Sequence, residues 1–444
     1  MQKKFIIRGG EPLAGEIEVL GAKNVALKAL VATLLTDEEV VLENIPSISD
    51  LDQMVRILHC LGRKVECPKK HQVIVKKGEI RNCRVDLDMA AHLRASSMVL
   101  GPLLARVGEA IVPNPGGCRI GARPIDRHVE GLKKMGATVA YNRDDGYFYM
   151  KASKLKGIEY TFEKNTHTGT ETLILAAVLG EGTTVLENAA EEPEVDDLVS
   201  LLISMGADIK RIQPRKIIIH GKEKLHGTNY TIMSDRNEAV TFAVGAYMSK
   251  GNILIKGTQA KHMKTFFDRL YDAGAKWEVI DEEAIRFYWS KDLHPTDVVT
   301  LPHPGFMTDW QAPWCLLMTQ ANGVSTIHET VFEDRFGYVA ELRKTGAHIN
   351  LYNPPVSNPQ SFYNFNWSDN KEEYFHAAHV VGPTTLHNGI LNITDLRAGA
   401  TLVLAAIGAT GESILHGVEH IDRGYERLDE RLNLLGASIQ RVID

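Results

Sequence analysis

The stretch Met205-Gly206-Ala207-Asp208-Ile209 ends a helical pattern with a glycine and then begins an apolar strand. A glycine just beyond the last helical residue readily takes the left-handed conformation that commonly ends a helix. Five further stretches have the same order of residue types, centred on Gly62, Gly136, Gly274, Gly346 and Gly436. Successive glycines are 74, 70, 68, 72 and 90 residues apart. The sequence therefore predicts six copies of one unit of about 70 residues.

Each copy reads as a first helix, a turn, a strand, a loop and a second helix. In the third copy these are residues 171–179, a turn, the strand at 183–188 and the helix at 195–204. The first helices are apolar on nearly all sides, as in residues 26–35 and 402–407, and such helices are buried. We therefore expect an α/β fold of six βα repeat units, in which each domain has three buried helices walled by three small sheets and covered by amphipathic helices.

The length of 444 residues favours two domains. An equal division of the six units places the boundary near residues 225–235, where Gly227-Thr228-Asn229-Tyr230 forms a polar linker. Residues 1–20 precede the first unit and are expected to pair with the C-terminal half. The predicted domains are thus residues 1–20 with 230–444, and residues 21–229. The longest interval between glycines indicates an insertion, which we place at residues 353–371 as a surface loop.

Composition and charge narrow the class of protein. The formal net charge of −6 argues against nonspecific binding of nucleic acid. The five cysteines have a spacing that suits neither a zinc site nor a disulfide framework, which favours a reducing compartment. The N-terminus lacks a signal-peptide core, and no window approaches 18 uninterrupted apolar residues. We expect a cytoplasmic protein that does not span a membrane.

A loop at residues 113–128 is rich in glycine, proline and arginine. Its single cysteine, Cys118, has Arg119, Arg123 and Arg127 nearby in sequence, and positive charge favours the thiolate. The alternative for any cysteine is a small buried side chain, and this is the interpretation that we give to Cys60 and Cys315. The loop has no apolar face to bury, so Cys118 is predicted to be a reactive thiol.

Cations stand near the start of four of the buried helices: Lys23, Arg94, Arg236 and Arg397. Neighbouring Asp, Asn, Ser and Thr residues are ordinary N-caps. A cation is unfavourable at the positive end of a helix dipole unless an anion binds there. The substrate is therefore expected to carry several negative charges.

Seven motifs, in this order, make the chain resemble the UDP-N-acetylglucosamine 1-carboxyvinyltransferases, a family of enolpyruvyl transferases that open peptidoglycan precursor synthesis. The resemblance runs from Phe5 to Val442. The motifs are Gly21-Ala22-Lys23-Asn24, Arg94-Ala95-Ser96, residues 115–124 around Cys118, Thr308-Asp309-x-Gln311-Ala312, residues 329–336, Thr394-Asp395-Leu396-Arg397-Ala398 and residues 420–427.

The resemblance implies a two-domain inside-out α/β barrel whose halves close over the substrates. It implies transfer of the enolpyruvyl group of phosphoenolpyruvate to the 3′-hydroxyl of UDP-N-acetylglucosamine, with release of phosphate. It implies no metal or other cofactor, because lysine and arginine neutralise the phosphate. The expected partners are these two small molecules, without nucleic acid or membrane.

The resemblance also assigns roles to residues. Cys118 would be the general acid that protonates the enol carbon, and the thiol alkylated by fosfomycin-type epoxides. Asp309 would take the proton of the attacking hydroxyl, assisted by Asn24 and Asp395. Phosphoenolpyruvate would be held by Lys23, Arg123 and Arg423, with Arg397 and Arg94 nearby. The UDP-sugar would be surrounded by Arg123, Pro124, Ile125, Asp126, Arg127, His128, Lys164, Asn165, Thr166, His167 and Val331.

The stretch at residues 164–171 departs from the family pattern. Residues 164–171 read Lys-Asn-Thr-His-Thr-Gly-Thr-Glu, whereas the family usually has Lys-x-Ser-Val-Gly-Ala-Thr. Two alternatives stay open at the level of sequence. One is a related enolpyruvyl transferase with another acceptor, similar to 5-enolpyruvylshikimate-3-phosphate synthase. The other is a noncatalytic protein that binds UDP-sugars.

Overall fold

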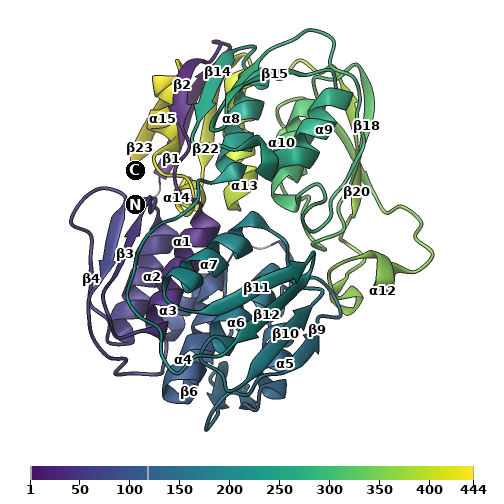
Figure 1. Ribbon diagram of the computed structural model, residues 1–444. Coiled ribbons are helices and arrows are strands. Elements are labelled where there is room, and N and C mark those ends of the chain that lie inside the picture. The colour runs from purple at the N-terminus through teal and green to yellow at the C-terminus, as the bar shows by residue number, and fades with distance from the viewer. Residues whose placement is uncertain (1–2, 118–119, 444) are drawn as a thin grey trace. The chain divides into compact units, whose positions relative to one another are not determined.

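The computed structural model describes residues 3–117 and 120–443, and they divide into two compact units (Figure 1). The first unit consists of the described parts of Met1–Leu20, Cys118–Arg123 and Ser234–Asp444. The second consists of Gly21–Gly117 and Pro124–Met233. Each unit has its own apolar core.

The described part of the first unit has three four-stranded sheets, with strand orders β21-β22-β1-β23, β15-β16-β14-β2 and β17-β18-β20-β19. The strands are β1 (Lys3–Gly9), β2 (Ala14–Glu18), β14 (Asn252–Lys256), β15 (Lys276–Asp281), β16 (Ala284–Tyr288), β17 (Val298–Val299), β18 (Gly323–His328), β19 (His348–Tyr352), β20 (Ala377–Gly382), β21 (Ile390–Asn392), β22 (Gly411–His416) and β23 (Ser438–Ile443).

Three buried helices of this unit pack against one another: α8 (Arg236–Met248), α10 (Gln311–Met318) and α13 (Leu396–Gly408). They are apolar on nearly every side, so their burial removes most of their surface from water. The remaining helical segments of the unit are η3 (Ala260–Met263), α9 (Lys264–Asp272), η4 (Thr308–Trp310), α11 (Val339–Arg343), α12 (Pro359–Phe362), η5 (Trp367–Asp369), α14 (Glu419–Asp422) and α15 (Leu428–Leu434).

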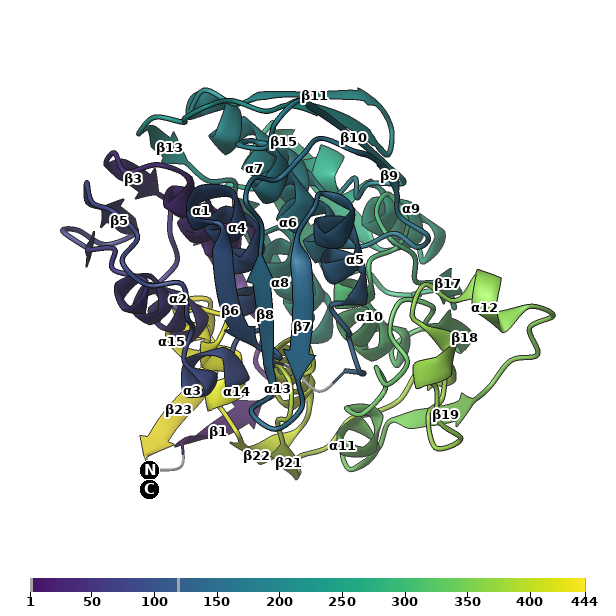
Figure 2. The same cartoon turned by 90° about the horizontal axis from the view of Figure 1, so that it is seen from below.

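The second unit repeats this plan with sheets ordered β13-β3-β5-β4, β6-β8-β7 and β11-β12-β10-β9. Figure 2 shows β8 between β6 and β7. The strands are β3 (Val40–Glu43), β4 (Val65–Glu66), β5 (Gln72–Val75), β6 (Glu109–Pro113), β7 (Thr138–Asn142), β8 (Tyr147–Lys151), β9 (Glu159–Thr161), β10 (Thr183–Glu187), β11 (Asp208–Gln213), β12 (Lys216–His220) and β13 (Asn229–Thr231).

Its buried helices are α1 (Lys23–Ala32), α4 (Leu100–Val107) and α6 (His167–Ala177). Helix α4 packs against α6, and α1 packs against α7 (Pro193–Ser204). The other helical segments are η1 (Thr33–Leu35), α2 (Ser49–Cys60), α3 (Leu87–Ala91), η2 (Arg94–Val99), α5 (Asp126–Lys134) and α7 (Pro193–Ser204). The predicted arrangement of three buried helices walled by three small sheets is confirmed for both units.

The six glycines that predicted the repeat all end helices. Each has a positive φ, from 69° at Gly274 to 101° at Gly136. A residue with a Cβ is strained in this region of the backbone map, which explains why glycine recurs there. The repeat of about 70 residues is therefore visible as six sheets in the described part of the chain.

The N-terminal segment belongs to the unit of the C-terminal half. Strand β1 pairs with β22 and β23, and β2 pairs with β14. The chain passes between the units at Met233–Ser234 rather than at 229–230. The reason for this difference is that β13 pairs with β3 inside the second unit, so the predicted polar linker is part of a sheet.

The predicted insertion lies between β19 and β20 and is more than a polar surface loop. Its aromatic side chains form a cluster in which Tyr363 stacks on Trp367 with ring centroids 5.1 Å apart, and Tyr363 also packs on His376. Tyr363 and Phe365 are buried. The Asn364 N–H donates to the Thr330 carbonyl at 2.7 Å. The insertion therefore has a small core of its own.

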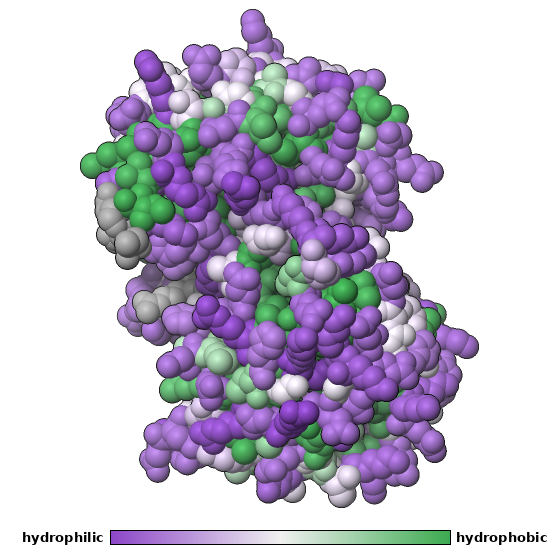
Figure 3. Space-filling model, turned by 90° about the vertical axis from the view of Figure 1, so that its left-hand side faces the viewer, coloured by the Kyte–Doolittle hydropathy of each residue, from purple (hydrophilic) through white to green (hydrophobic). Residues whose placement is uncertain are grey.

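On the face shown in Figure 3, hydrophilic side chains predominate and hydrophobic ones gather in separate small groups. Among the described residues, no helix combines the length and hydropathy that crossing a membrane requires.

Candidate active site

Two aspartates of the first unit cap its buried helices. Asp395 accepts hydrogen bonds from the Arg397 and Ala398 N–H groups, at 2.9 and 3.2 Å, and so caps α13. Asp235 caps α8 in the same way through its Oδ1. Side-chain caps of this kind satisfy N–H groups that have no partner within the helix. Asp395, which the sequence predicts to assist the reaction, thus has a structural role as the N-cap of α13.

Arg397 lies beside both capped helix ends and is only 6 % exposed. Its Nη2 donates to the second oxygen of Asp235 at 3.3 Å, and its guanidinium lies over the ring of Tyr425. Burial alone would lower its pKa, but Tyr425, Asp235 and Asp309 outweigh burial and raise the pKa of Arg397. Its Nη1 is buried and has no hydrogen-bond partner among the described residues. A buried guanidinium N–H without an acceptor favours an anionic ligand.

Asp309 stands next to this arginine, in η4 at the start of α10. Its Oδ1 accepts from Arg335 Nη2 at 3.2 Å, and its Oδ2 lies 4.0 Å from Arg397 Nε. The side chain is 25 % exposed. Asp309 is therefore an ionisable carboxyl that two arginines orient and that a ligand can still reach. The predicted base and Arg397 lie close together.

Val331 and Arg423 are two further sequence-predicted residues in this unit. Val331 follows β18, and its N–H donates to the buried Glu329 carboxylate at 2.8 Å. Burial raises the pKa of Glu329, while Arg335 and the N–H groups of Val331 and Phe332 oppose that rise. Arg423 follows α14 directly. The segment that carries Val331 is thus held by a buried carboxylate.

The loop predicted to hold the reactive thiol is described only in part. Cys118 lies outside the described residues, as does Arg119. The sequence assigned the whole loop to the domain of residues 21–229, whereas residues 120–123 belong to the first unit. Glu333 accepts the Ala122 N–H, and Arg123 lies over the ring of Phe332. The sequence could not show this, because Glu333 is 211 residues away.

In the second unit, α1 begins with Lys23 and has no side-chain cap. Lys23 Nζ lies 2.6 Å from the Asp50 carboxylate, and both side chains are at most 10 % exposed. The predicted helper Asn24 is the next residue of α1. A cation at an uncapped helix start offers an anion both a charge and unpaired N–H groups.

Arg94 is close enough to His128 for its positive charge to affect the pKa of that imidazole. Arg94 Nη1 donates to the Pro115 carbonyl at 3.2 Å. His128 is buried, and its Nε2 shares a hydrogen bond with Thr168 Oγ1 at 3.0 Å. Burial, together with the charge of Arg94, lowers the pKa of His128 to about 3. His128 is therefore neutral at ordinary pH and suits hydrogen bonding better than proton transfer.

The other predicted residues of this region begin α5 or come just before it: Pro124, Ile125, Asp126 and Arg127. Lys164 lies close enough to Arg127 that burial and this second cation both lower the pKa of Lys164. Asn165 Nδ2 donates to the Asn188 carbonyl at 3.2 Å. Thr166 caps α6 by accepting the Gly169 N–H at 3.2 Å. The unit therefore gathers Arg127 and Lys164 near one another.

Two functional candidates escaped the sequence reasoning: Lys28 and Glu171. Lys28 Nζ lies 3.0 Å from Glu171 Oε1, and both side chains are buried. His167 Nε2 lies 3.1 Å from the same oxygen. The departure of residues 164–171 from the family pattern is the feature of the sequence that could have drawn attention to Glu171. Nothing in the sequence connected Lys28 with it.

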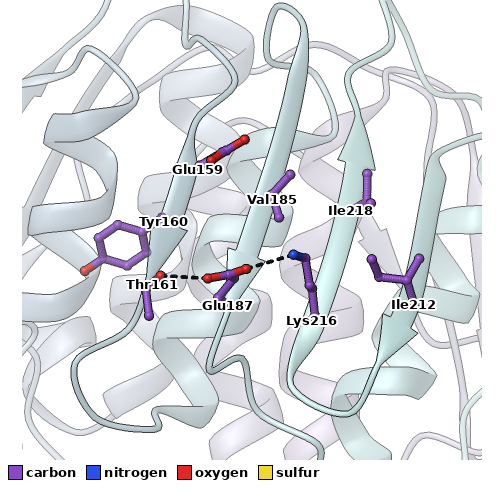
Figure 4. A pocket seen from close by; sticks show the side chains of 8 residues that line it. All are labelled: Glu159, Tyr160, Thr161, Val185, Glu187, Ile212, Lys216 and Ile218. Carbon is purple, nitrogen blue, oxygen red and sulfur yellow. Dashed lines mark hydrogen bonds and ion pairs between the residues drawn. The ribbon is translucent and has the colours of Figure 1, made fainter.

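A surface hollow of about 420 Å³ lies elsewhere, over the sheet of β9, β10, β11 and β12 (Figure 4). Glu187 lies at its centre and accepts hydrogen bonds from Thr161 and Lys216, at 3.1 and 2.8 Å. None of the sequence-predicted site residues lines it. Among residues 3–117 and 120–443, no group of three or more His, Cys, Asp or Glu side chains is arranged to hold a metal ion.

Comparison with known proteins adds an independent line of evidence. The sequence profile of EPSP synthase (3-phosphoshikimate 1-carboxyvinyltransferase) matches residues 7–432. The UDP-N-acetylglucosamine 1-carboxyvinyltransferases of Acidobacterium capsulatum and Koribacter versatilis are each 42% identical to this chain, over 99% of it and 96% of their own length. That of Magnetococcus marinus is 41% identical over 99% of both chains.

Solved structures agree on the fold. The enolpyruvyl transferase NikO from Streptomyces tendae superposes with a TM-score of 0.86 at 24% identity, covering 99% of both chains. EPSP synthase from Acinetobacter baumannii has a TM-score of 0.73 at 18% identity over the full length of both. These likenesses confirm the predicted two-domain α/β architecture.

Proposed function

The chain belongs to the UDP-N-acetylglucosamine 1-carboxyvinyltransferase family of enolpyruvyl transferases, and from this premise we propose its reaction. The enolpyruvyl group of phosphoenolpyruvate is transferred to the 3′-hydroxyl of UDP-N-acetylglucosamine, and phosphate is released. The product serves peptidoglycan precursor synthesis, and we place the enzyme in the cytoplasm.

The observation that carries the proposal is the cluster of Arg397 and Asp309. The guanidinium of Arg397 is buried, and its Nη1 has no hydrogen-bond partner among the described residues. Its Nε lies 4.0 Å from Oδ2 of the partly exposed Asp309 carboxylate. The first group suits the carboxylate or phosphate of phosphoenolpyruvate. The second suits removal of a proton from a hydroxyl. A protein that only bound sugar nucleotides would need the anion site but not the base.

In the proposed reaction, the Cys118 thiol gives its proton to C3 of phosphoenolpyruvate, which leaves positive charge at C2. The sugar 3′-oxygen forms a bond to C2 while Asp309 takes the hydroxyl proton. The C2–O bond then breaks, and phosphate leaves with the electron pair of that bond. C3 returns a proton to the Cys118 thiolate, which restores both the double bond and the thiol. Lys23, Arg123, Arg397 and Arg423 stabilise the charge on phosphate and carboxylate, with Arg94 nearby.

The sugar nucleotide is assigned to residues 124–128 and 164–167, with Asn24, Arg123 and Val331. Three observations in the second unit support this assignment. Helix α5 begins at Asp126, Lys164 and Arg127 concentrate positive charge, and α6 begins at His167. Helix N-termini with nearby cations suit a diphosphate.

The reaction is tested by measuring phosphate release from phosphoenolpyruvate with purified protein and different acceptors. We expect release with UDP-N-acetylglucosamine and none with shikimate 3-phosphate or with no acceptor. Release with shikimate 3-phosphate alone would establish the related acceptor instead. Binding of UDP-N-acetylglucosamine in a calorimeter without any release would establish a noncatalytic binder.

A further inference from the structure

We propose that His167 determines how tightly the sugar nucleotide binds, and that Lys28 and Glu171 are positioning residues that fix its imidazole at the start of α6. This inference rests on the proposed function, because it concerns the acceptor assigned to residues 164–167. It adds a hydrogen-bond donor and a pH dependence where the usual family pattern has a valine, whose apolar side chain can supply neither.

The first step is the geometry of the cluster. Lys28 comes from α1, whereas His167 and Glu171 are one turn apart on α6. Lys28 Nζ and His167 Nε2 both approach Glu171 Oε1, at 3.0 and 3.1 Å, and lie 3.3 Å from each other. Glu171 is fully buried and Lys28 nearly so. Lys28 and Glu171 are thus a buried ion pair that holds the imidazole through its Nε2.

The second step concerns the free side of the ring. All hydrogen bonds of His167 to described residues run through Nε2, and the side chain is 23 % exposed. Nδ1 is the ring nitrogen left for a group outside the cluster. When Nε2 accepts a hydrogen bond from Lys28 Nζ, or when the ring is an imidazolium, Nδ1 carries a hydrogen and becomes a donor. An oxygen of the nucleotide diphosphate is the acceptor that suits it.

The third step concerns the second carboxylate oxygen of Glu171. Glu171 Oε2 is buried without a hydrogen-bond partner in the described part of the chain, so the carboxylate is held entirely through Oε1. A buried carboxylate with half of its capacity unused is costly. Such an arrangement is hard to explain as packing alone, because leucine would fill the same space. A role for the charge in fixing and charging His167 explains it.

The cluster also sets the sign of the pH dependence. The charged groups that face His167 are Glu171 on its own helix, Lys28 on α1 and Glu192 just before α7. Burial and Lys28 disfavour the imidazolium, but the two glutamates outweigh them and raise the pKa of His167 above 6.5. The imidazolium binds an anion better than the neutral ring does. Affinity for the sugar nucleotide therefore falls as the pH rises through that pKa.

The test compares His167→Val, His167→Asn and Glu171→Gln with wild type, by steady-state kinetics and by calorimetric binding of UDP-N-acetylglucosamine from pH 5.5 to 9. For His167→Val we expect KM and Kd for the sugar nucleotide to rise about tenfold at pH 6.5, the value of one lost charge-assisted hydrogen bond. kcat and KM for phosphoenolpyruvate should stay within about twofold. His167→Asn, whose amide replaces Nδ1, should recover part of the affinity but lose the pH dependence.

Glu171→Gln removes the dominant stabiliser of the imidazolium, so the midpoint of the pH profile should move to lower pH. The control is His220→Gln, which changes a histidine of the same unit whose partner is the neutral Thr183. Melting temperatures of all variants separate loss of folding from loss of binding.

Equal Kd values for wild type and His167→Val across this pH range would overturn the inference. So would a parallel loss of kcat and of phosphoenolpyruvate affinity, which indicates a structural role. If wild type neither binds nor converts the sugar nucleotide, the proposed function itself fails. The two failures are therefore distinguishable.

Discussion

Each of the two units buries a cluster of charged side chains, and the two clusters differ in their ratio of cations to carboxylates. In the first unit, Arg397 and Arg335 face Asp235 and Asp309, so two cations meet two carboxylates. In the second, Lys28 and His167 share the single carboxylate of Glu171. The first cluster is neutral in sum and presents a carboxylate that can accept a proton. The second gains positive charge when His167 is protonated and presents a donor. The difference fits a general base beside an anion site in the first unit, and an anion site without a base in the second.

The largest expected effect comes from removing the base of the first cluster. Asp309→Asn keeps the shape but loses the proton acceptor, so kcat should fall by about 10²–10⁴-fold, the range for general base catalysis. Phosphate release under saturating substrates measures it. Asp235→Asn is the matched variant, since it changes the other carboxylate beside Arg397 and should cost much less. Equal losses in the two variants would remove the special role of Asp309.

The cation of the second cluster is tested through stability. Lys28→Met leaves Glu171 as a buried carboxylate without its main partner, which should lower the free energy of unfolding by about 3–5 kcal/mol. Denaturant unfolding measures this loss. The double variant Lys28→Met with Glu171→Leu removes both charges and should recover most of the stability. A double variant as unstable as the single one would mean that packing, rather than charge, makes Lys28 important.

A conservative change of the first cluster's cation gives a smaller effect. Arg397→Lys keeps the charge but loses the planar fork and the free Nη1 that we assign to phosphoenolpyruvate. KM for phosphoenolpyruvate should rise about tenfold, as expected for one lost charge-assisted hydrogen bond. KM for the sugar nucleotide should change little. An unchanged KM for phosphoenolpyruvate would show that Nη1 does not meet the donor substrate.

Asp197 shows how a buried acid behaves when no ion pair holds it. It accepts hydrogen bonds from the Tyr230 hydroxyl at 2.9 Å and the Met233 N–H at 3.3 Å, and no ion pair with a described residue accompanies them. Burial raises its pKa from 3.8 to about 6, against these two hydrogen bonds. Because the folded pKa is the higher one, folding favours the protonated acid. Stability is therefore lost as the pH rises from about 4 to 6.

Asp197→Asn should accordingly raise the melting temperature relative to wild type more at pH 8 than at pH 4, by a few degrees at most for a chain of this size. Thermal unfolding followed at both pH values measures the difference. The control is Asp196→Asn, which changes the neighbouring carboxylate that pairs with Arg211 on the surface. A difference that is independent of pH would show that Asp197 stays ionised throughout.

The sequence predicted the repeat because glycine is the residue that tolerates a positive φ at each helix end, so a backbone requirement left a mark at regular intervals. It singled out Arg397 because a cation is unfavourable at a helix N-terminus without an anion, and it predicted Asp309 through the resemblance to the family. It missed the Lys28–Glu171 pair, because the periodicity of each helix shows which face is buried but not which charges meet there. It misplaced residues 120–123, because the carboxylate that holds Ala122 comes from a segment far along the chain.

The central claim is tested most directly by running the reaction in D₂O and following the sugar nucleotide product by NMR. The account predicts an enolpyruvyl ether on the 3′-oxygen of UDP-N-acetylglucosamine, with deuterium in its methylene group, because an acid adds a proton to C3 before phosphate leaves. An ether whose methylene contains no deuterium would contradict the protonation step. The absence of any ether from this acceptor would contradict the proposed function.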